Sequence, residues 1–411
     1  MLTEGQTTQF DDIFRSLGDT LDITETQFEA AVRSYRAVGD WLSKPESPLS
    51  IYRPEIRPQG SFMLGTMIKP VNDKDDLDID LVCELTGKNP NWTQFDLKQK
   101  VGMRLRDNGT YKEMLQKEGR RCWTLRYSDT ANYHMDILPS LVCHGYSTIM
   151  EQTFSSSWIG MHDYEKLAIR ITDNLEPNYR VERNPDFWMK SNPFGYAQWF
   201  FRRASLGASR NFAMFSDAVK SVPSYQKTKL PLQRVVQILK RHRDIMFKGD
   251  CDKPISIIIT TLAARAYQGE TSVTEALQTV ITHMKDHITE VYDEKSGKMI
   301  KQIANPVNPE ENFADKWVEH PQRQVNFYKW LDAVRNDTYQ ILQQRGLPVI
   351  AQAMNKPFGE QMVKKVFASL ADVSRDTRES GNLKMATGTG ILSSVGTVTA
   401  KAHHFYGKNS E

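Results

Sequence analysis

The segment D-L-D-I-D-L, residues 76–81, alternates acidic with apolar side chains. In a β-strand, residues i and i+2 share a face and lie roughly 6.6 Å apart at Cα, so Asp78 and Asp80 should converge on one side. Two ionised carboxylates about 4 Å apart repel by roughly 4 kcal/mol at an effective dielectric near 20, and a divalent cation would convert that repulsion into binding. Oxygen ligands suit Mg²⁺, which also takes phosphate oxygens. The pattern predicts a magnesium site; the alternative is a half-exposed strand with an acidic face.

Two neighbouring features favour the metal site. Gly60 and Ser61 precede the acidic strand, and a glycine lets the backbone approach a phosphate while the serine offers a hydroxyl and an N–H donor. Asp136 lies in a second strand-like segment, Y-H-M-D-I-L-P, at residues 133–139. If the two strands are neighbours, Asp136 adds a third carboxylate. Three carboxylates can hold two Mg²⁺ ions about 3.5–4 Å apart, one at a triphosphate and one at an attacking hydroxyl.

The hydrophobic pattern predicts the elements that position these residues. The capping-box pattern T-E-T-Q, residues 24–27, begins a long amphipathic helix. The β-prone runs LDIDLVCEL, CWTLRYS and NYHMDILPSLVC follow, with residues 94–119 between them as helix. The second half is predicted to be mostly helical, with helices beginning at Pro231 and spanning about 255–268, 273–284, 323–343 and 360–373.

Length and composition describe a globular chain. Its 411 residues suffice for a full hydrophobic core and two lobes, with 39% apolar and 25% charged residues. The 53 basic and 50 acidic residues nearly balance, which does not indicate a surface that coats nucleic acid. The four cysteines lack zinc-ligand spacing. No signal segment and no apolar run of roughly 18 residues is readable, so we expect a cytoplasmic protein without membrane contact.

Taken together, the motifs carry a family resemblance. A G-S pair, a D-x-D and a later single Asp in a hydrophobic strand resemble the nucleotidyltransferases related to DNA polymerase beta. More narrowly, Q-G-S-F-x-L-G-T-x-I-K-P, then D-I-D-L-V and H-x-D-I-L-P, is similar to the cGAS/DncV-like nucleotidyltransferases, the CD-NTases of bacterial anti-phage (CBASS) systems. The resemblance covers nearly the whole chain.

This resemblance implies an α+β fold. A polymerase beta-like core, in which helices flank a mixed sheet, would join a C-terminal helical lobe, with the active site in the cleft between them. The expected parts are N-terminal helices at 1–48 including a long spine helix, the nucleotidyltransferase core at 49–225, the helical lobe at 226–380 and a flexible tail at 381–411.

The resemblance also implies a catalytic triad. Asp78, Asp80 and Asp136 would bind two Mg²⁺ ions, with Mn²⁺ as a substitute. Asp76 precedes the matched pair and is expected at the rim of the site.

A further set of residues is expected to contact the donor triphosphate. In this family a lysine on the helix after the core reaches the phosphates, as a suitable point charge, and a serine opening the next helix assists. The matching residues here are Gln59, Gly60, Ser61, Lys240 and Ser256. Two alternatives stay open: Lys240 could lie on a solvated helix face with Arg241 and Arg243, and Ser256 could be an ordinary helix start.

The implied function is synthesis of a cyclic di- or trinucleotide second messenger from nucleoside triphosphates, ATP and/or GTP, with release of pyrophosphate, in anti-phage defence. The alternatives are an enzyme that makes linear oligoadenylates or modifies an external acceptor such as an RNA end, and a non-catalytic nucleotide-binding relative.

Two partner expectations follow from the same resemblance. The zinc-binding insertion of the animal DNA-sensing members is absent from the sequence, so no requirement for duplex DNA is expected. The tail ends H-H-F-Y-G-K-N-S-E and would suit docking to a CBASS accessory protein, with Phe405 and Tyr406 as anchors. A disordered end without a partner is the alternative.

Overall fold

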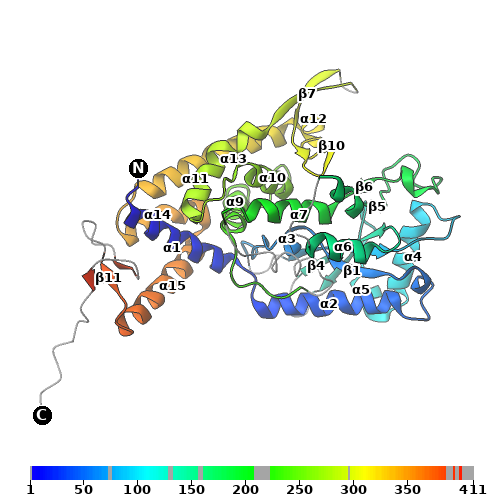
Figure 1. Cartoon of the computed structure of the whole chain (residues 1–411), viewed down its shortest axis with the longest axis horizontal. Coiled ribbons are helices and arrows are strands. Elements are labelled where there is room, and N and C mark those ends of the chain that lie inside the picture. The colour runs from blue at the N-terminus through cyan, green and yellow to red at the C-terminus, as the bar shows by residue number, and fades with distance from the viewer. Residues whose placement is uncertain are drawn as a thin grey trace, which may run out of the picture.

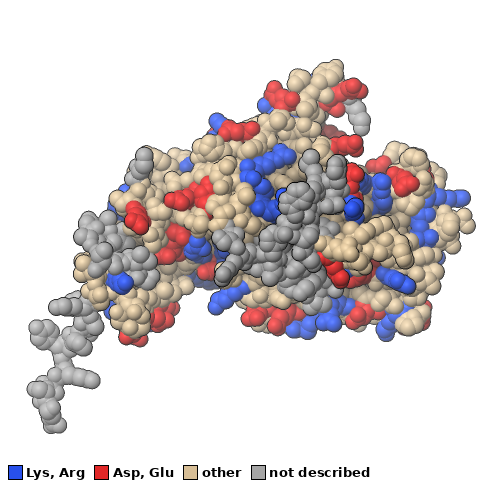
Figure 2. Space-filling view, viewed as in Figure 1, with Lys and Arg blue, Asp and Glu red and all other residues tan. Residues whose placement is uncertain are grey.

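The computed structural model has a sheet-containing part at one end and a helical part at the other (Figure 1). This arrangement confirms the predicted α+β class. The structure describes residues 2–72, 76–127, 133–155, 161–207, 223–294, 297–385, 392–393 and 398–399. On the face shown in Figure 2, acidic and basic side chains are interspersed. Within the described residues, no helix combines the length and the apolar composition that a membrane span requires.

A mixed six-stranded sheet forms the frame of the first part. Its strands are β1 (Glu55–Pro58), β2 (Leu77–Leu85), β3 (Trp123–Tyr127), β4 (Tyr133–Leu141), β5 (Ile169–Ile171) and β6 (Lys190–Ser191). They follow the order β1-β2-β4-β5-β6, and β3 also pairs with β4. β2 and β4 are parallel, whereas the other pairs are antiparallel. The parallel pair β2–β4 lies inside the sheet. Its register sets Asp80 directly beside Asp136.

Alternation along β2 separates a buried face from an acidic one. Leu77, Ile79 and Leu81 are at most 8% exposed and belong to a core that we call the sheet core. Helices α2 (Glu25–Ser43), α4 (Gln94–Arg106) and α5 (Gly109–Met114) cover that face. The acidic residues therefore face the opposite side, toward the helical part.

A larger helical core fills the rest of the molecule. Its main helices are α1 (Glu4–Leu21), α6 (Tyr146–Ser155), α7 (Pro193–Ala204), α9 (Pro231–Phe247), α10 (Ser256–Ala266), α11 (Val273–His283), α13 (Pro321–Gln343), α14 (Leu347–Phe358) and α15 (Glu360–Glu379). α9 lies at its centre and packs against α1, α7, α10, α11, α13 and α14. Shorter elements are α3 (Gly60–Met63), α12 (Lys316–Glu319) and the hairpins β7–β8 (Thr289–Asp293, Lys298–Gln302) and β9–β10 (Ala304–Asn305, Asn308–Asn312).

Several predicted helix starts are confirmed. Thr24 forms the expected capping box with Gln27 at the start of α2, and Pro231 is the first residue of α9. The predicted helix at 94–119 is instead two helices, because the side chain of Asn108 caps a new one. α14 was not predicted.

The N-terminal region contains a helix in addition to the one predicted to begin with the capping box at residue 24. α1 precedes it and begins with the same kind of capping box, formed by Thr3 and Gln6. Phe14 and Leu17 of α1 lie in the helical core, whereas α2 packs in the sheet core. The two N-terminal helices are thus divided between the cores.

The predicted flexible tail lies partly within the described residues. There, three two-residue strands pair into a small sheet: β11 (Lys384–Met385), β12 (Leu392–Ser393) and β13 (Val398–Thr399). The proposed anchors Phe405 and Tyr406 lie outside the described residues.

Candidate active site

The sheet brings the three predicted acidic residues to one place. Asp78 and Asp80 share a face of β2, and Asp136 is the direct neighbour of Asp80 on β4. The side chain of Asp78 is 83% exposed, whereas Asp80 and Asp136 are half-buried. The condition attached to the sequence prediction, that the two strands be neighbours, is therefore met.

Burial, together with the charges of neighbouring carboxylates, opposes the ionisation of Asp78 and Asp80. Burial, then the charges of Asp136 and Asp78, raise the pKa of Asp80 from 3.8 to about 6, with Lys240 acting in the opposite sense. The pKa of Asp78 is also raised, first by loss of hydration between the walls of the cleft, although its tip is open to water. Nearby His134 counteracts that rise. Such a cluster is stabilised by a cation, because a cation relieves the repulsion.

Neighbouring groups fix the carboxylates in position. Thr124 on β3 donates its hydroxyl hydrogen to Asp136 Oδ1 at 2.5 Å. Gly60 approaches Asp80 so closely that a Cβ there would lie 2.6 Å from Asp80 Oδ2, and its φ of +59° also favours glycine. The backbone N–H of Gln59 donates to the carbonyl of Asp80 at 2.8 Å. The G-S turn is thus anchored directly against the acidic strand.

Asp76 has different surroundings. Its Oδ2 lies 2.9 Å from His134 Nε2 and 3.2 Å from Arg126 Nε. Asp76 lines the cleft and is paired with side chains of β3 and β4, and its expected rim position stays a prediction. His134 and Arg126 were not singled out in the sequence.

An open cleft of about 960 Å³ lies between the acidic face and the helical core. Gly60, Ser61, Asp78 and Asp80 line it from the sheet side. The helical wall includes Lys240, Arg243, Asp244, Lys248, Lys253, Ser256 and Thr260. Gln59 and Asp136 lie beside residues of the cleft and are not among those that line it. The volume is near the upper end of the range for small-molecule sites.

Lys240 points into this cleft from α9. It is only 6% exposed, and its Nζ donates to the carbonyl of Thr66 at 3.0 Å. Burial, then the charge of Arg243, lower its pKa to about 8, whereas Asp244, Asp80 and Asp78 favour the charged form. The alternative of a solvated helix face is wrong, because Arg241 and Arg243 are buried as well. The ammonium group has two further N–H donors for a ligand.

Ser256 is the first residue of α10 and also lines the cleft. Its Oγ accepts a hydrogen bond of 2.8 Å from Arg243 Nη1. A guanidinium group can only donate, so the serine hydroxyl hydrogen is directed to another acceptor. This polarity suits an anionic group in the cleft.

Side chains of α9 also hold the loop that follows α3. Four of them donate to backbone carbonyls of this segment: Gln233 to Leu64 (2.8 Å), Gln237 to Met67 (2.9 Å), Lys240 to Thr66 (3.0 Å) and Arg241 to Lys69 (2.5 Å). This contact was not predicted from the sequence. Its only local signal is the spacing of Gln233, Gln237 and Arg241 at about one helical turn.

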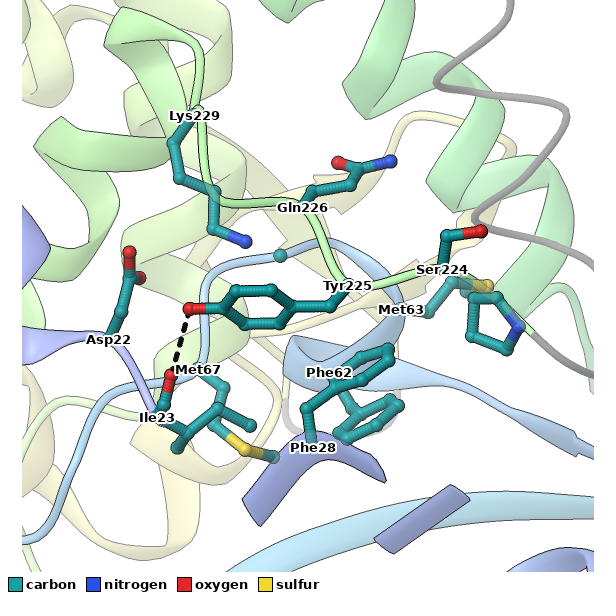
Figure 3. A pocket seen from close by; sticks show the side chains of 12 residues that line it. Asp22, Ile23, Phe28, Phe62, Met63, Met67, Ser224, Tyr225, Gln226 and Lys229 are labelled. Carbon is teal, nitrogen blue, oxygen red and sulfur yellow. Dashed lines mark hydrogen bonds between the residues drawn. The ribbon is translucent and has the colours of Figure 1, made fainter. Parts of the chain in front are cut away.

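A second, smaller hollow lies behind α3 (Figure 3). Phe28 and Phe62 stack there with ring centroids 4.8 Å apart, and the Tyr225 hydroxyl donates to the carbonyl of Ile23 at 3.2 Å. Its volume of about 40 Å³ holds only a few water molecules. A nucleotide fits the large cleft but not this hollow. The side chains that line the hollow pack against the back of the G-S turn.

A mixed sheet with three carboxylates on one face, opposite a helical part across a cleft, is the fold of a polymerase beta-like nucleotidyltransferase. Residues 54–139 match the family model described as the cyclic GMP-AMP synthase DncV-like nucleotidyltransferase domain. That span contains the G-S turn and all three acidic residues.

Relatives extend this likeness over the whole chain. A c-di-GMP synthase of Roseivirga ehrenbergii is 28% identical over 410 residues, which is 99% of this chain and 100% of the relative. The cyclic dinucleotide synthase CdnG of Bradyrhizobium diazoefficiens is 23% identical over 325 residues, 74% of this chain and 70% of the relative. The solved structure of that CdnG in complex with GTP has a TM-score of 0.63 at 18% identity and covers 88% of this chain and 99% of its own.

Residues 54–139 therefore form a DncV-like nucleotidyltransferase domain, and the chain is similar to two cyclic dinucleotide synthases, to one of them over its whole length. The chain is an enzyme that makes a cyclic oligonucleotide from nucleoside triphosphates.

Proposed function

We propose that this enzyme converts two molecules of GTP into cyclic di-GMP and two pyrophosphates, as a cytoplasmic signal in bacterial anti-phage defence. The structural observation that carries the catalytic part is the set of three carboxylates on one face of two parallel strands, opposite a buried lysine. The choice of guanine rests on the c-di-GMP synthase that matches over 99% of this chain and on the GTP complex of CdnG.

Divalent cations suit the cluster of three carboxylates on β2 and β4. Asp78, Asp80 and Asp136 would hold them, because the donor set consists of oxygens, and burial together with the charges of Asp136 and Asp78 raises the pKa of Asp80. Two Mg²⁺ ions, with Mn²⁺ as a substitute, would neutralise phosphate charge and acidify the attacking hydroxyl. Thr124 keeps Asp136 oriented toward this position through its hydrogen bond.

The other residues position the donor nucleotide. The backbone at Gly60 and Ser61 would approach the phosphates beside Asp80, while Lys240 and the Ser256 hydroxyl would donate to them from the helical wall. The 3′- or 2′-hydroxyl of the acceptor attacks the α-phosphorus, the bond to the bridging oxygen breaks, and pyrophosphate leaves with the electron pair. A second such transfer within the linear product closes the ring. Most of the rate gain comes from positioning and charge neutralisation.

The test is incubation of the purified protein with each nucleoside triphosphate separately and with all four together, in Mg²⁺. We expect GTP alone to give a product with the mass of c-di-GMP that resists exonuclease. The Asp78→Asn/Asp80→Asn variant should give no product while keeping its circular dichroism spectrum. A product only from mixed nucleotides would overturn the guanine assignment. Linear oligoadenylates, or transfer only to an added RNA end, would overturn the cyclisation.

An accessory partner at the C-terminal tail is a second proposal. A solved E. coli CdnC structure is described as a complex with HORMA-deltaN, which supports partner binding among CD-NTases with this fold. Deletion of residues 402–411 should leave nucleotide synthesis in vitro unchanged and abolish phage protection in cells that carry the native operon. Full protection by the truncated enzyme would exclude the tail as the docking element.

A further inference from the structure

We propose that Lys253 is an additional phosphate-binding residue, which contacts the two outer phosphates of the donor and holds them as they leave as pyrophosphate. This inference rests on the proposed binding of a nucleoside triphosphate in the cleft. It extends the expected contacts of Lys240 and Ser256 to a residue that neither the motifs nor the resemblance indicated.

Lys253 lies on the segment that joins α9 to α10 and lines the cleft. Its side chain is 36% exposed, so the ammonium group is accessible from the cleft. Asp78 and Asp80 line the same cleft from the sheet side. Ser256 follows Lys253 three residues later on the helical wall. Lys253 is therefore well placed for a phosphate that bridges the two sides.

The present partner of Lys253 can release it at little cost. Lys253 Nζ lies 3.6 Å from Asp244 Oδ1, which is longer than a good hydrogen bond. The same Asp244 oxygen accepts from Arg243 Nε at 2.8 Å and lies 2.7 Å from its Nη2. Asp244 is thus already paired with Arg243, and one of the two positive charges is in excess. An anion can take over Lys253 without leaving Asp244 uncompensated.

The backbone around Lys253 is held on both sides. Arg243 Nη1 donates to the carbonyl of Pro254 at 3.1 Å. On the other side, Asp252 Oδ1 lies 3.2 Å from Arg323 Nε, and its carbonyl accepts from Asn326 Nδ2 at 3.2 Å. The Cα of Lys253 is therefore fixed relative to α9 and α13, while its long side chain can change partner. The Lys253 ammonium group could therefore keep its contact with the pyrophosphate while that product leaves.

Lys248 offers a matched control. It lies on the same segment, lines the same cleft and is exposed. Lys253→Gln and Lys248→Gln each remove one positive charge and keep a side chain of similar length. If Lys253 acts by direct contact, only the replacement of Lys253 should weaken pyrophosphate binding. If Lys253 only adds to the positive electrostatic potential of the cleft, the two replacements should weaken pyrophosphate binding equally.

The experiment is equilibrium titration of the full chain, in Mg²⁺, with pyrophosphate, GMP and a GTP analogue whose α–β bridge cannot be cleaved. We expect Lys253→Gln to weaken pyrophosphate and the analogue about tenfold, as for loss of one charge-assisted hydrogen bond, and to leave GMP unchanged. Lys253→Arg should restore most of the loss, and Lys248→Gln should bind as the wild type. Unchanged pyrophosphate affinity in Lys253→Gln, or equal losses in the two Gln variants, would overturn the proposal.

This readout does not depend on which product the enzyme makes. If the wild type binds the analogue but yields a product other than c-di-GMP, the proposed function fails and the Lys253 comparison stands. If c-di-GMP forms and the two Gln variants bind pyrophosphate alike, the Lys253 proposal alone fails.

Discussion

In an Asp80→Asn variant, one of three crowded carboxylates becomes a neutral amide of nearly the same size. Asp80 has a pKa of about 6 in the folded protein against 3.8 for the free side chain. The folded state therefore holds this proton more tightly than the unfolded state, and stability falls as pH rises through the window from 3.8 to about 6. The shift of roughly two pKa units corresponds to an upper limit of about 3 kcal/mol at pH 8. Removing the charge should thus stabilise the metal-free enzyme while abolishing its activity.

The assay is urea unfolding in EDTA at pH 8 and pH 5. The gain in the free energy of unfolding should be greatest at pH 8 and fall to about half at pH 5, where Asp80 is mostly protonated in the folded wild type. Added Mn²⁺ should stabilise the wild type more than the variant. Asp244→Asn is the control in the same cleft, and it should destabilise because Asp244 accepts hydrogen bonds from Arg243. A less stable Asp80→Asn protein at pH 8, or an equal gain at both pH values, would refute the electrostatic reasoning.

Three further predictions concern the supports of the site and its activator. Gly60→Ala should cost about 1–3 kcal/mol of stability in thermal unfolding and most of the turnover, because its φ is +59° and its new Cβ would meet Asp80; wild-type turnover would contradict the close approach. Thr124→Val should lower kcat about tenfold or more with an unchanged melting temperature, since Asp136 loses its hydrogen bond; Thr124→Ser should recover activity, and an unaffected Val variant would exclude this role. Long duplex DNA added at low salt should not increase turnover; strong stimulation that disappears with salt would contradict this expectation.

Local patterns were sufficient to predict the elements of the site. Strict alternation defined β2, and a lone acid between apolar residues marked β4. The predicted starts of α2 and α9 hold because capping and proline signals lie within one turn of the helix. The register between β2 and β4, by contrast, depends on pairing across more than fifty residues, so the neighbourhood of Asp80 and Asp136 could only be stated as a condition.

The contacts that support the site could not be predicted from the sequence for the same reason. Thr124 and Arg243 look ordinary in the sequence, and their partners Asp136 and Ser256 are known only once the chain has folded. Lys240 was expected as a ligand-binding residue, but its bond to the loop after α3 depends on packing between two distant segments. The start of α1 is a different case: it falls within the N-terminal helices expected at 1–48, and its capping box of Thr3 and Gln6 lies within one turn of the chain.

The most direct test of the two-cation assignment is diffraction from crystals grown with Mn²⁺ and a GTP analogue that cannot be cleaved between the α- and β-phosphates. We predict two anomalous peaks about 3.5–4 Å apart, bounded by Asp78, Asp80, Asp136 and the phosphates. Crystals of the Asp78→Asn/Asp80→Asn variant should lose both peaks. A bound analogue with manganese only at other carboxylates would contradict the assignment of these three residues as the catalytic metal ligands.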